Sequence, residues 1–333
     1  MLSKGQKLNR IITATSVVVV FMLILIGGIV RSTGAGMGCP DWPKCFGNWV
    51  PPTNVSQLPA DYMTKYAPAG GGGIEFNAVK TWTEYMNRLF GMLAGLFVFA
   101  AAISSFAWWK KDKSITILSI VSLLLIGFEG LVGAKVVMKN LAEHTVSIHL
   151  GLAYLIAALL IIAYSKISFG NLAANNFPVN KLKNNWIAGV TLLIVSTQIL
   201  VGTFVRTEID TIANNNDTLT RSQWIDNARS YLPGHKIFSV AVLLSCLYLA
   251  VQFRDWAKEN KAVRMGIIVM LASLAGQFIT GFSLYSFGFP AFAQPVHVLF
   301  SSFIFGSVVF ILSYKNLYTR KTGVEMQNQV HYA

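Results

Sequence analysis

The sequence predicts an all-α integral membrane protein with eight transmembrane helices, arranged as two parallel-repeat four-helix bundles. Hydrophobic residues make up 54% of the chain and charged residues only 12%, which is typical of a protein dissolved in lipid. The apolar residues gather in eight runs, each close to the length that about 30 Å of hydrocarbon requires. Motifs of the first half also recur in the second half in the same order.

Each apolar run is interpreted as one spanning helix. The runs lie at residues 11–30, 89–109, 114–134, 145–164, 187–205, 237–253, 265–285 and 298–314. The first run is too long for a signal-peptide core and no small-residue cleavage site follows it, so we keep it as a helix. We expect an N-terminal half at 1–165, a cytoplasmic linker at 166–185 and a C-terminal half at 186–333.

The net charge of +13 is explained by the membrane rather than by a nucleic acid partner. More than half of the 27 Lys and Arg residues fall on the side of the N-terminus, as the positive-inside rule requires of a cytoplasmic side. We therefore expect a multi-pass protein of the cell (plasma) membrane, in contact with lipid, with both termini cytoplasmic. The long loops 31–83 and 206–232 then lie outside.

Cys39 and Cys45 lie in the first outer loop, within the stretch GGIVRSTGAGMGCPDWPKCFG. An extracytoplasmic loop permits a disulfide, and a short closed loop can bridge this separation, so we expect the pair to be bonded. Its role stays open between a structural staple and a redox-active pair, and the lack of a nearby His disfavours a metal site. Cys246 lies alone in an apolar run and is expected to pack there.

Internal repeats support two related halves. The first run ends in LIGGIVRSTG and the fifth in ILVGTFVRTE, each with Gly, an apolar pair, Arg and Thr near the outer membrane edge. A second unit places Glu or Gln four residues before Gly, at Glu129/Gly133, Gln198/Gly202 and Gln277/Gly281. We expect Glu129 to occupy a hydrogen-bonded polar position between helices. An intramembrane carboxylate in a duplicated chain also suits a transporter, but the paired Gly/Pro breaks typical of transporter repeats are not seen.

The histidines follow the same repeat. His235 and His297 are 62 residues apart, and so are Asn87 and His149 at the corresponding places of the first half. His235 and His297 lie on helices that enter the membrane from outside, so they reach similar depth. Facing imidazoles on neighbouring helices are how a helical bundle holds haem iron, and two such groups in an apolar segment favour a cofactor over polar packing.

Cations at the outer rim would pair with haem propionates. Arg206 and Lys236 are the candidates, and ordinary interfacial snorkelling is the alternative for both. The first half has different chemistry, because Asn87 stands where the second half has His235, with Glu84 one helical turn earlier. One strong ligand beside a carboxylate indicates a site that transforms a porphyrin rather than clamping it. The alternative for Glu84 is a helix N-terminal carboxylate stabilised by the macrodipole.

At these residues the chain resembles the heme A synthase family, membrane oxygenases that convert haem O to haem A for terminal oxidases. The resemblance covers roughly residues 8–315 and rests on the cysteine stretch quoted above, on EYMNR, and on His149, His235 and His297. It implies a cofactor haem b held by His235 and His297 and a haem O substrate in the first half. There it implies His149 as iron ligand and Glu84 as catalytic residue, with Asn87, Arg88 and Arg31 as neighbours.

The reaction implied by the resemblance is oxidation of a porphyrin ring methyl to a formyl group by successive hydroxylations. Molecular oxygen or water would supply the oxygen atom, and haem O synthase is an expected partner. The chain departs from the family at Asn87, where bacterial members often have His, and residues 206–232 lack the second Cys pair that some members carry. We therefore expect His149 to hold the substrate haem alone or with a weak sixth group. The alternative function is a membrane cytochrome b that transfers electrons, which gives Glu84 no role.

Overall fold

The expected fold class is confirmed by the computed structural model, which describes residues 2–67, 75–139, 141, 143–172, 186–215 and 218–331. Within these residues the chain is helical, without a strand, and eight helices are long and apolar enough to cross a membrane. They are α1 (Lys4–Ser32), α3 (Ala78–Ser105), α4 (Lys113–Met138), α5 (Glu143–Leu172), α7 (Ile187–Asn215), α9 (Leu232–Glu259), α10 (Lys261–Ser286) and α11 (Ala293–His331). The short helices α2 (Tyr62–Lys65) and α8 (Arg221–Asn227) lie in the connections.

Polar caps set where several of these helices begin. Ser3 and Gln6 form a capping box at the start of α1, and the side chains of Asn77, Asp112 and Asn260 accept backbone N–H groups at the starts of α3, α4 and α10. These contacts satisfy donors that the first helical turn leaves free. The helices consequently begin at their caps and not at the edge of the apolar run.

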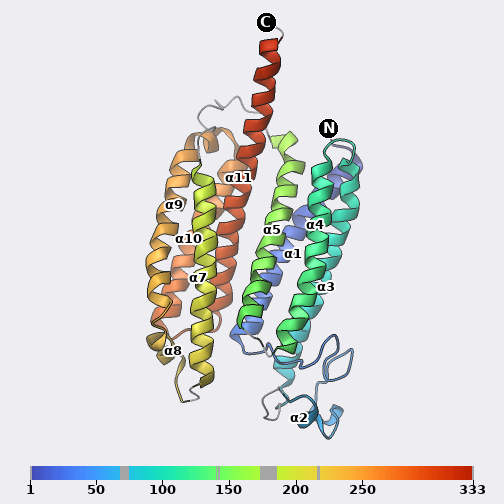
Figure 1. The fold of residues 1–333 in the computed structure, drawn as a ribbon, viewed down its shortest axis with the longest axis vertical. Coiled ribbons are helices and arrows are strands. Elements are labelled where there is room, and N and C mark those ends of the chain that lie inside the picture. The colour runs from blue at the N-terminus through green and yellow to red at the C-terminus, as the bar shows by residue number, and fades with distance from the viewer. Residues whose placement is uncertain are drawn as a thin grey trace.

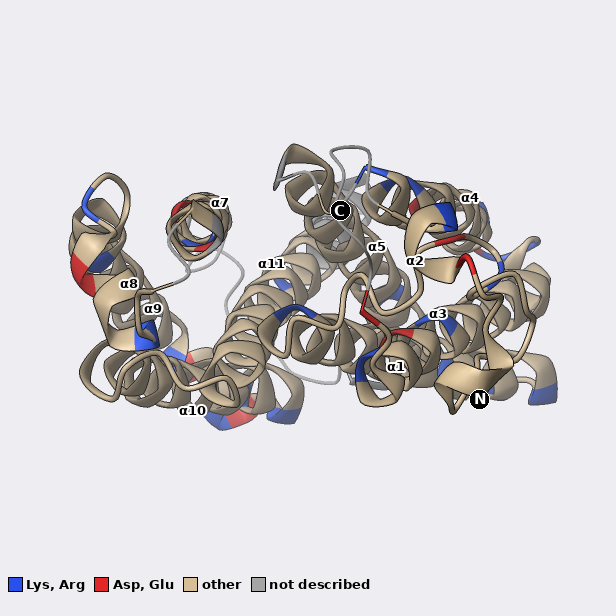
Figure 2. Cartoon of the chain, turned by 90° about the horizontal axis from the view of Figure 1, so that it is seen from below, with Lys and Arg blue, Asp and Glu red and all other residues tan. Residues whose placement is uncertain are grey.

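The spanning helices pack as two groups of four (Figures 1 and 2). In one group α1 contacts α3 and α5, and α4 contacts the same two helices; in the other, α7, α9, α10 and α11 form the corresponding ring. Helix α11 packs against both α1 and α5 and so joins the groups. Helix α1 begins and α11 ends at one end of the molecule, and α2 and α8 lie at the other (Figure 1). The grouping suits two four-helix halves, and their origin by repetition stays a prediction.

Three boundaries differ from the sequence-based expectation. Helix α5 continues to Leu172, so the expected linker 166–185 starts later, and 173–185 lie outside the described residues. Helix α7 runs to Asn215, which places Arg206 on a helix and not in a loop. Helix α3 begins at Ala78, well before its apolar run. Hydropathy marks only the part of a helix that lies in lipid, whereas backbone hydrogen bonding continues into the polar edge.

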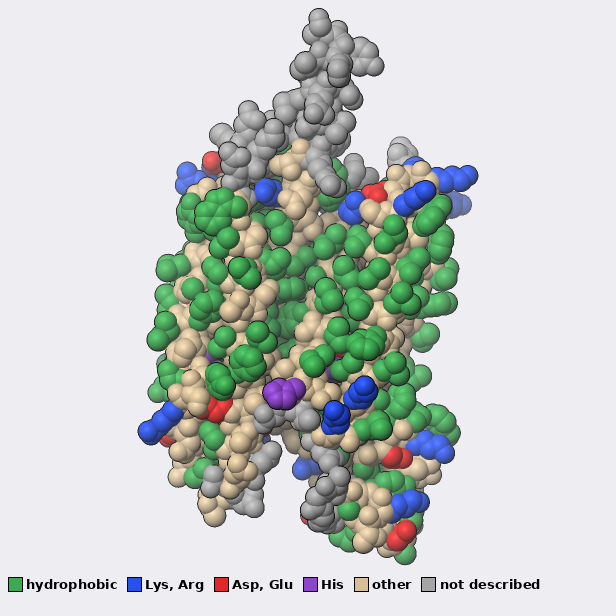
Figure 3. Space-filling view, viewed as in Figure 1, with side chains coloured by type: hydrophobic (Ala, Val, Ile, Leu, Met, Phe, Trp, Pro, Cys, Tyr) green, Lys and Arg blue, Asp and Glu red, His purple; other side chains and the backbone are tan. Residues whose placement is uncertain are grey.

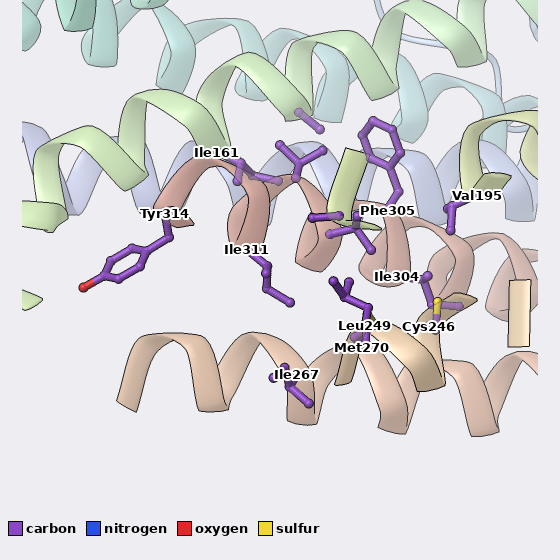
Figure 4. Close-up of a cluster of buried hydrophobic side chains, with 14 of the residues drawn as sticks. Ile161, Val195, Cys246, Leu249, Ile267, Met270, Ile304, Phe305, Ile311 and Tyr314 are labelled. Atoms are coloured by element: carbon purple, nitrogen blue, oxygen red, sulfur yellow. The ribbon is translucent and has the colours of Figure 1, made fainter. Parts of the chain in front are cut away.

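Apolar side chains fill the space between the helices and cover the outside. Cys246, Met270 and Ile304 belong to the main buried cluster (Figure 4), and the Cys246 thiol is free and fully buried, as expected. On the face shown in Figure 3, hydrophobic side chains cover the middle of the molecule, with Lys and Arg mostly toward its two ends. This distribution is that of a chain surrounded by hydrocarbon at mid-height.

Small residues bring the two halves into close contact. A Cβ atom added at Gly28 of α1 would lie 3.0 Å from Pro295 of α11. One added at Gly306 of α11 would lie 2.8 Å from the ring of Phe21 on α1. Membrane helices use glycine in this way to pack backbone against backbone.

Candidate functional site

A cavity of about 640 Å³ lies between α7, α9, α10 and α11. Its wall is mostly apolar, and the polar groups on it include both His235 and His297. Helices α1 and α5 of the first half also contribute residues to the wall, among them Arg31 and Tyr154. The cavity therefore belongs to the second half and reaches the boundary between the halves.

His235 and His297 face one another in this cavity. Their ring centres are 6.5 Å apart, with the ring planes inclined at 56°. A metal ion held by two imidazole nitrogens lies about 2 Å from each of them. Adding the distance from each nitrogen to the centre of its ring gives a separation of the ring centres close to the one observed. The buried Nδ1 of His235 also lacks a hydrogen-bond partner in the described chain. The cavity thus fits a haem whose iron is held by two imidazoles.

The partners of His297 define its tautomer. Its Nδ1 lies 3.0 Å from Oγ1 of Thr280, and that hydroxyl lies 2.8 Å from the carbonyl of Gly276. Since the hydroxyl donates its single hydrogen to the carbonyl, it accepts from Nδ1–H. Nε2 then carries the free lone pair, which the Gln277 amide contacts at 2.8 Å. Binding of iron to Nε2 requires this amide to move aside. The contact of Thr280 with His297 was not predicted from the sequence, where Thr280 shows only as a residue one turn after Gln277.

The Glu/Gln-to-Gly unit of the sequence has a common structural role. Each glycine lies under a histidine ring of a neighbouring helix, where an added Cβ would come within 3.2–3.3 Å of the ring Cε1. The pairs are Gly133 with His149, Gly202 with His235, and Gly281 with His297. The polar residue four positions earlier contacts the same histidine in every case. The unit therefore seats a histidine against the adjacent helix.

Cationic side chains gather at the outer edge of the cavity. Arg31 and Arg206 each form a 2.7 Å ion pair with Asp210, and Arg206 also donates to Gln294. Two guanidinium groups share one carboxylate, so positive charge remains for an anionic group. The Nζ of Lys236 lies over the ring of Tyr285, 3.2 Å from its centre. The structure thus places Arg31, expected beside the first-half site, at the second-half cavity instead.

Glu84 is buried on α3 and binds the cysteine loop. Its Oε2 accepts the backbone N–H of Cys39 at 2.7 Å, and its Oε1 accepts from Arg88 at 2.5 Å. Because α3 begins at Ala78, no acidic residue lies in its first turn. The alternative role of Glu84 as a carboxylate stabilised by the helix N-terminus is therefore wrong. The contact with Cys39 was not foreseen from the sequence.

The loop that carries Cys39 and Cys45 is closed by a disulfide bond with an S–S distance of 2.03 Å. Both cysteines are fully buried. The guanidinium group of Arg88 donates to three loop carbonyls at 2.8–2.9 Å, those of Cys39, Asp41 and Lys44. Glu84 and Arg88 thus attach the disulfide loop to α3, which supports the structural staple among the two roles left open.

The loop also has a small aromatic core. Phe46 is buried and packs edge-on against Tyr66, with ring centres 5.4 Å apart. Burial and the nearby carboxylates of Asp41 and Asp61 raise the pKa of Tyr66 above its ordinary value. The phenol therefore stays neutral at physiological pH and acts here by packing.

Replacing Arg88 with Ala is expected to loosen the disulfide loop. The change leaves the buried carboxylate of Glu84 without its ion-pair partner, a loss that costs about 3–5 kcal/mol at fully buried sites. Hydrogen exchange followed by mass spectrometry should show faster exchange of the Cys39 amide. Arg88→Lys keeps the charge but not the planar fork, so an intermediate rate is expected. Lys44→Ala, which removes an exposed side chain of the same loop, is the control. Unchanged exchange in Arg88→Ala would contradict this account.

His149 lies on α5, with Nδ1 3.0 Å from Oε1 of the buried Glu129 on α4. His149 is half-buried, with 40% of its side chain exposed. His144, on the same helix, is exposed. Oδ1 of Asn87 is buried without a hydrogen-bond partner in the part of the chain described. Among the described residues, no hydrogen bond or ion pair joins Glu84 to His149. The first half thus contains a Glu84–Arg88 cluster at the loop and a Glu129–His149 pair deeper in the bundle.

Comparison with known proteins gives a consistent family. Residues 10–309 match the model of the family COX15-CtaA, described as cytochrome oxidase assembly protein. The chain is 26% identical over 308 residues to the heme A synthase of Halalkalibacterium halodurans, covering 90% of this chain and 94% of that protein. It is 28% identical over 284 residues to the heme A synthase of Shouchella clausii, covering 84% of each.

Proposed function

Because this chain belongs to the COX15-CtaA family of cytochrome oxidase assembly proteins, we propose that it is a membrane oxidoreductase that converts haem O to haem A. The observation that carries the proposal is that the two halves place different polar side chains at corresponding positions. The second half places two histidines across one cavity. The first half pairs His149 with a carboxylate and has Asn87 in the place of the second histidine.

His235 and His297 would each hold the iron of haem b through a ring nitrogen, which for His297 is Nε2. Thr280 supports this role because it keeps the proton of His297 on Nδ1. The surplus positive charge of Arg31 and Arg206 around Asp210 suits two propionates, and Lys236 is a third cation on the cavity wall. The bound haem would supply one-electron transfer. The protein would contribute the fixed ligands, a dry apolar wall and the cationic rim.

His149 would hold the iron of the haem O substrate in the first half. An amide is a poor iron ligand beside imidazole, so Asn87 would leave the opposite position weakly occupied. The catalytic residue would be Glu84, which would accept or release a proton at Oε1 or Oε2 while the ring methyl is oxidised to a formyl group. Its carboxylate is held by Cys39 and Arg88, so the disulfide loop would orient it. Molecular oxygen or water would supply the oxygen atom.

The cellular setting follows from charge and chemistry. We place the protein in the plasma membrane with both termini cytoplasmic, since more than half of its Lys and Arg fall on that side. The two candidate sites then lie toward the outer face. An enzyme that makes haem O must supply the substrate, which makes haem O synthase the expected partner.

Haem extracted from the purified protein is expected to contain haem B together with haem O or haem A. Two unlike sites predict two kinds of haem, and acid extraction followed by liquid chromatography and mass spectrometry identifies both. The protein should be produced in cells that also make haem O. Under that condition, recovery of haem B alone would support the electron-transfer cytochrome b and overturn the synthase.

A further inference from the structure

The three membrane histidines differ in what contacts Nδ1. For His297 the contact is the neutral Thr280 hydroxyl, and Nδ1 of His235 is buried without a partner in the described chain. For His149 the contact is the Glu129 carboxylate at 3.0 Å. Glu129 stands at the place of the Glu/Gln-to-Gly unit that Gln198 and Gln277 occupy in the second half. The exchange of amide for carboxylate is therefore confined to the first half.

We propose that Glu129 is a positioning residue for His149, with its carboxylate accepting the Nδ1–H of the imidazole. This contact fixes the tautomer that leaves Nε2 free for iron, and it makes His149 a stronger electron donor than His235 or His297. The inference rests on the proposed role of His149 as an iron ligand. It adds a residue that touches neither the substrate nor the iron and acts through the ligand.

The local geometry supports the contact. Nδ1 and Oε1 are at hydrogen-bond distance, although the ring is turned so that the N–H bond is not aimed at the oxygen. A rotation of the ring aligns them. Gly133 leaves room for the ring, because an added Cβ there would lie 3.2 Å from Cε1 of His149. Oε2 of Glu129 is buried without a hydrogen-bond partner in the described residues. The carboxylate is therefore available to accept a hydrogen bond from His149.

Electronic effects follow from the type of acceptor. A histidine that binds a metal usually donates its second ring N–H to a neighbouring group, which orients the ring and raises its basicity. An ionised acceptor forms a hydrogen bond roughly twice as strong as a neutral one. A carboxylate on Nδ1 thus pushes electron density toward Nε2 more than a hydroxyl does. The more strongly donating ligand stabilises the oxidised iron and lowers its reduction potential.

The test exchanges the two kinds of residue. Glu129→Gln installs the amide that the second half uses, with little change in volume. In protein loaded with haem O, resonance Raman spectra should show the iron–histidine stretch of the ferrous first-half haem at lower frequency. Spectroelectrochemical titration should show a higher midpoint potential for that haem, with the second-half haem unchanged. The same substitution at the exposed Glu75 is the control and should alter neither signal.

A reciprocal variant keeps the proposal testable if Glu129→Gln folds poorly. Thr280→Asp places a carboxylate where the hydroxyl now contacts Nδ1 of His297, and the second-half haem should then show a lower midpoint potential. The inference is overturned if Glu129→Gln leaves the stretch and the potential of the first-half haem as in the wild type while His149→Ala removes that haem. In that case the proposed function stands and only the role of Glu129 fails. If His149→Ala retains the first-half haem, both fail.

Discussion

Replacing His149 with Ala is expected to abolish conversion of haem O to haem A while the haem bound by His235 and His297 keeps its low-spin spectrum. The change removes the imidazole that we propose as the ligand of the substrate iron; His144, on the same helix, is the alternative imidazole. Loss of a group that merely supports a metal ligand already costs about 10–100-fold, so loss of the ligand itself should exceed that range. His149 does not line the second-half cavity, so that site should survive. Extracted haems, quantified by chromatography, measure both effects.

His144 provides a matched control for this experiment. It lies on α5 five residues before His149 and is exposed. His144→Ala should retain wild-type haem A production, because the residue points about 140° around the helix from His149. If the His149 variant still makes haem A at the normal rate, the first half is not the reaction site and the proposed mechanism is wrong.

Loss of either cavity histidine is expected to eliminate the bis-imidazole haem signal. The two rings lie on separate helices, α9 and α11, and under the proposed function each would supply one ligand to the haem iron, so one substitution is sufficient. In His297→Ala the Gln277 amide also loses its contact with the ring, and an unsatisfied buried polar group costs about 1–3 kcal/mol. Electron paramagnetic resonance of the oxidised protein, with optical spectra, detects the loss.

The His149 variant serves as the reciprocal control, since it should keep this signal. His235→Ala tests the other ligand in the same way. A normal bis-imidazole spectrum in both single variants would show that the cavity is not the haem b site. A loss in only one of them would identify a single histidine ligand and a different sixth group.

Features that depend only on the order and spacing of residues along the chain were predictable from the sequence. The eight helices follow from apolar runs, and the matched spacing of His235 and His297 placed them at similar depth because both helices enter from the same side. The Glu/Gln-to-Gly unit also pointed to a polar position at Glu129, which the contact with His149 confirms. In each case a repeat or a periodicity carries the information, and no knowledge of how distant segments pack is needed.

Contacts that depend on packing between distant segments were not predictable. The family resemblance implied that Arg31 lies near the first-half site, yet α1, which carries it, packs on α11 and delivers this side chain to Asp210. Residues 206–232 were expected to form a loop, so neither the helical ion pair of Arg206 with Asp210 nor the second arginine on that carboxylate was predicted. The Glu84–Cys39 contact depends on how a long loop folds back. Loop conformation carries no periodic signal.

The glycine contacts between α1 and α11 have a consequence for how the protein evolves. Gly28 against the backbone of Pro295 and Gly306 against the ring of Phe21 hold the two halves close together. Electron tunnelling between two redox centres weakens steeply with distance, so a spacing fixed in this way protects transfer from drift elsewhere. Under the proposed function, each half could change its own iron ligands without altering the distance between the two haems. Larger residues at these two glycines should push the two halves apart.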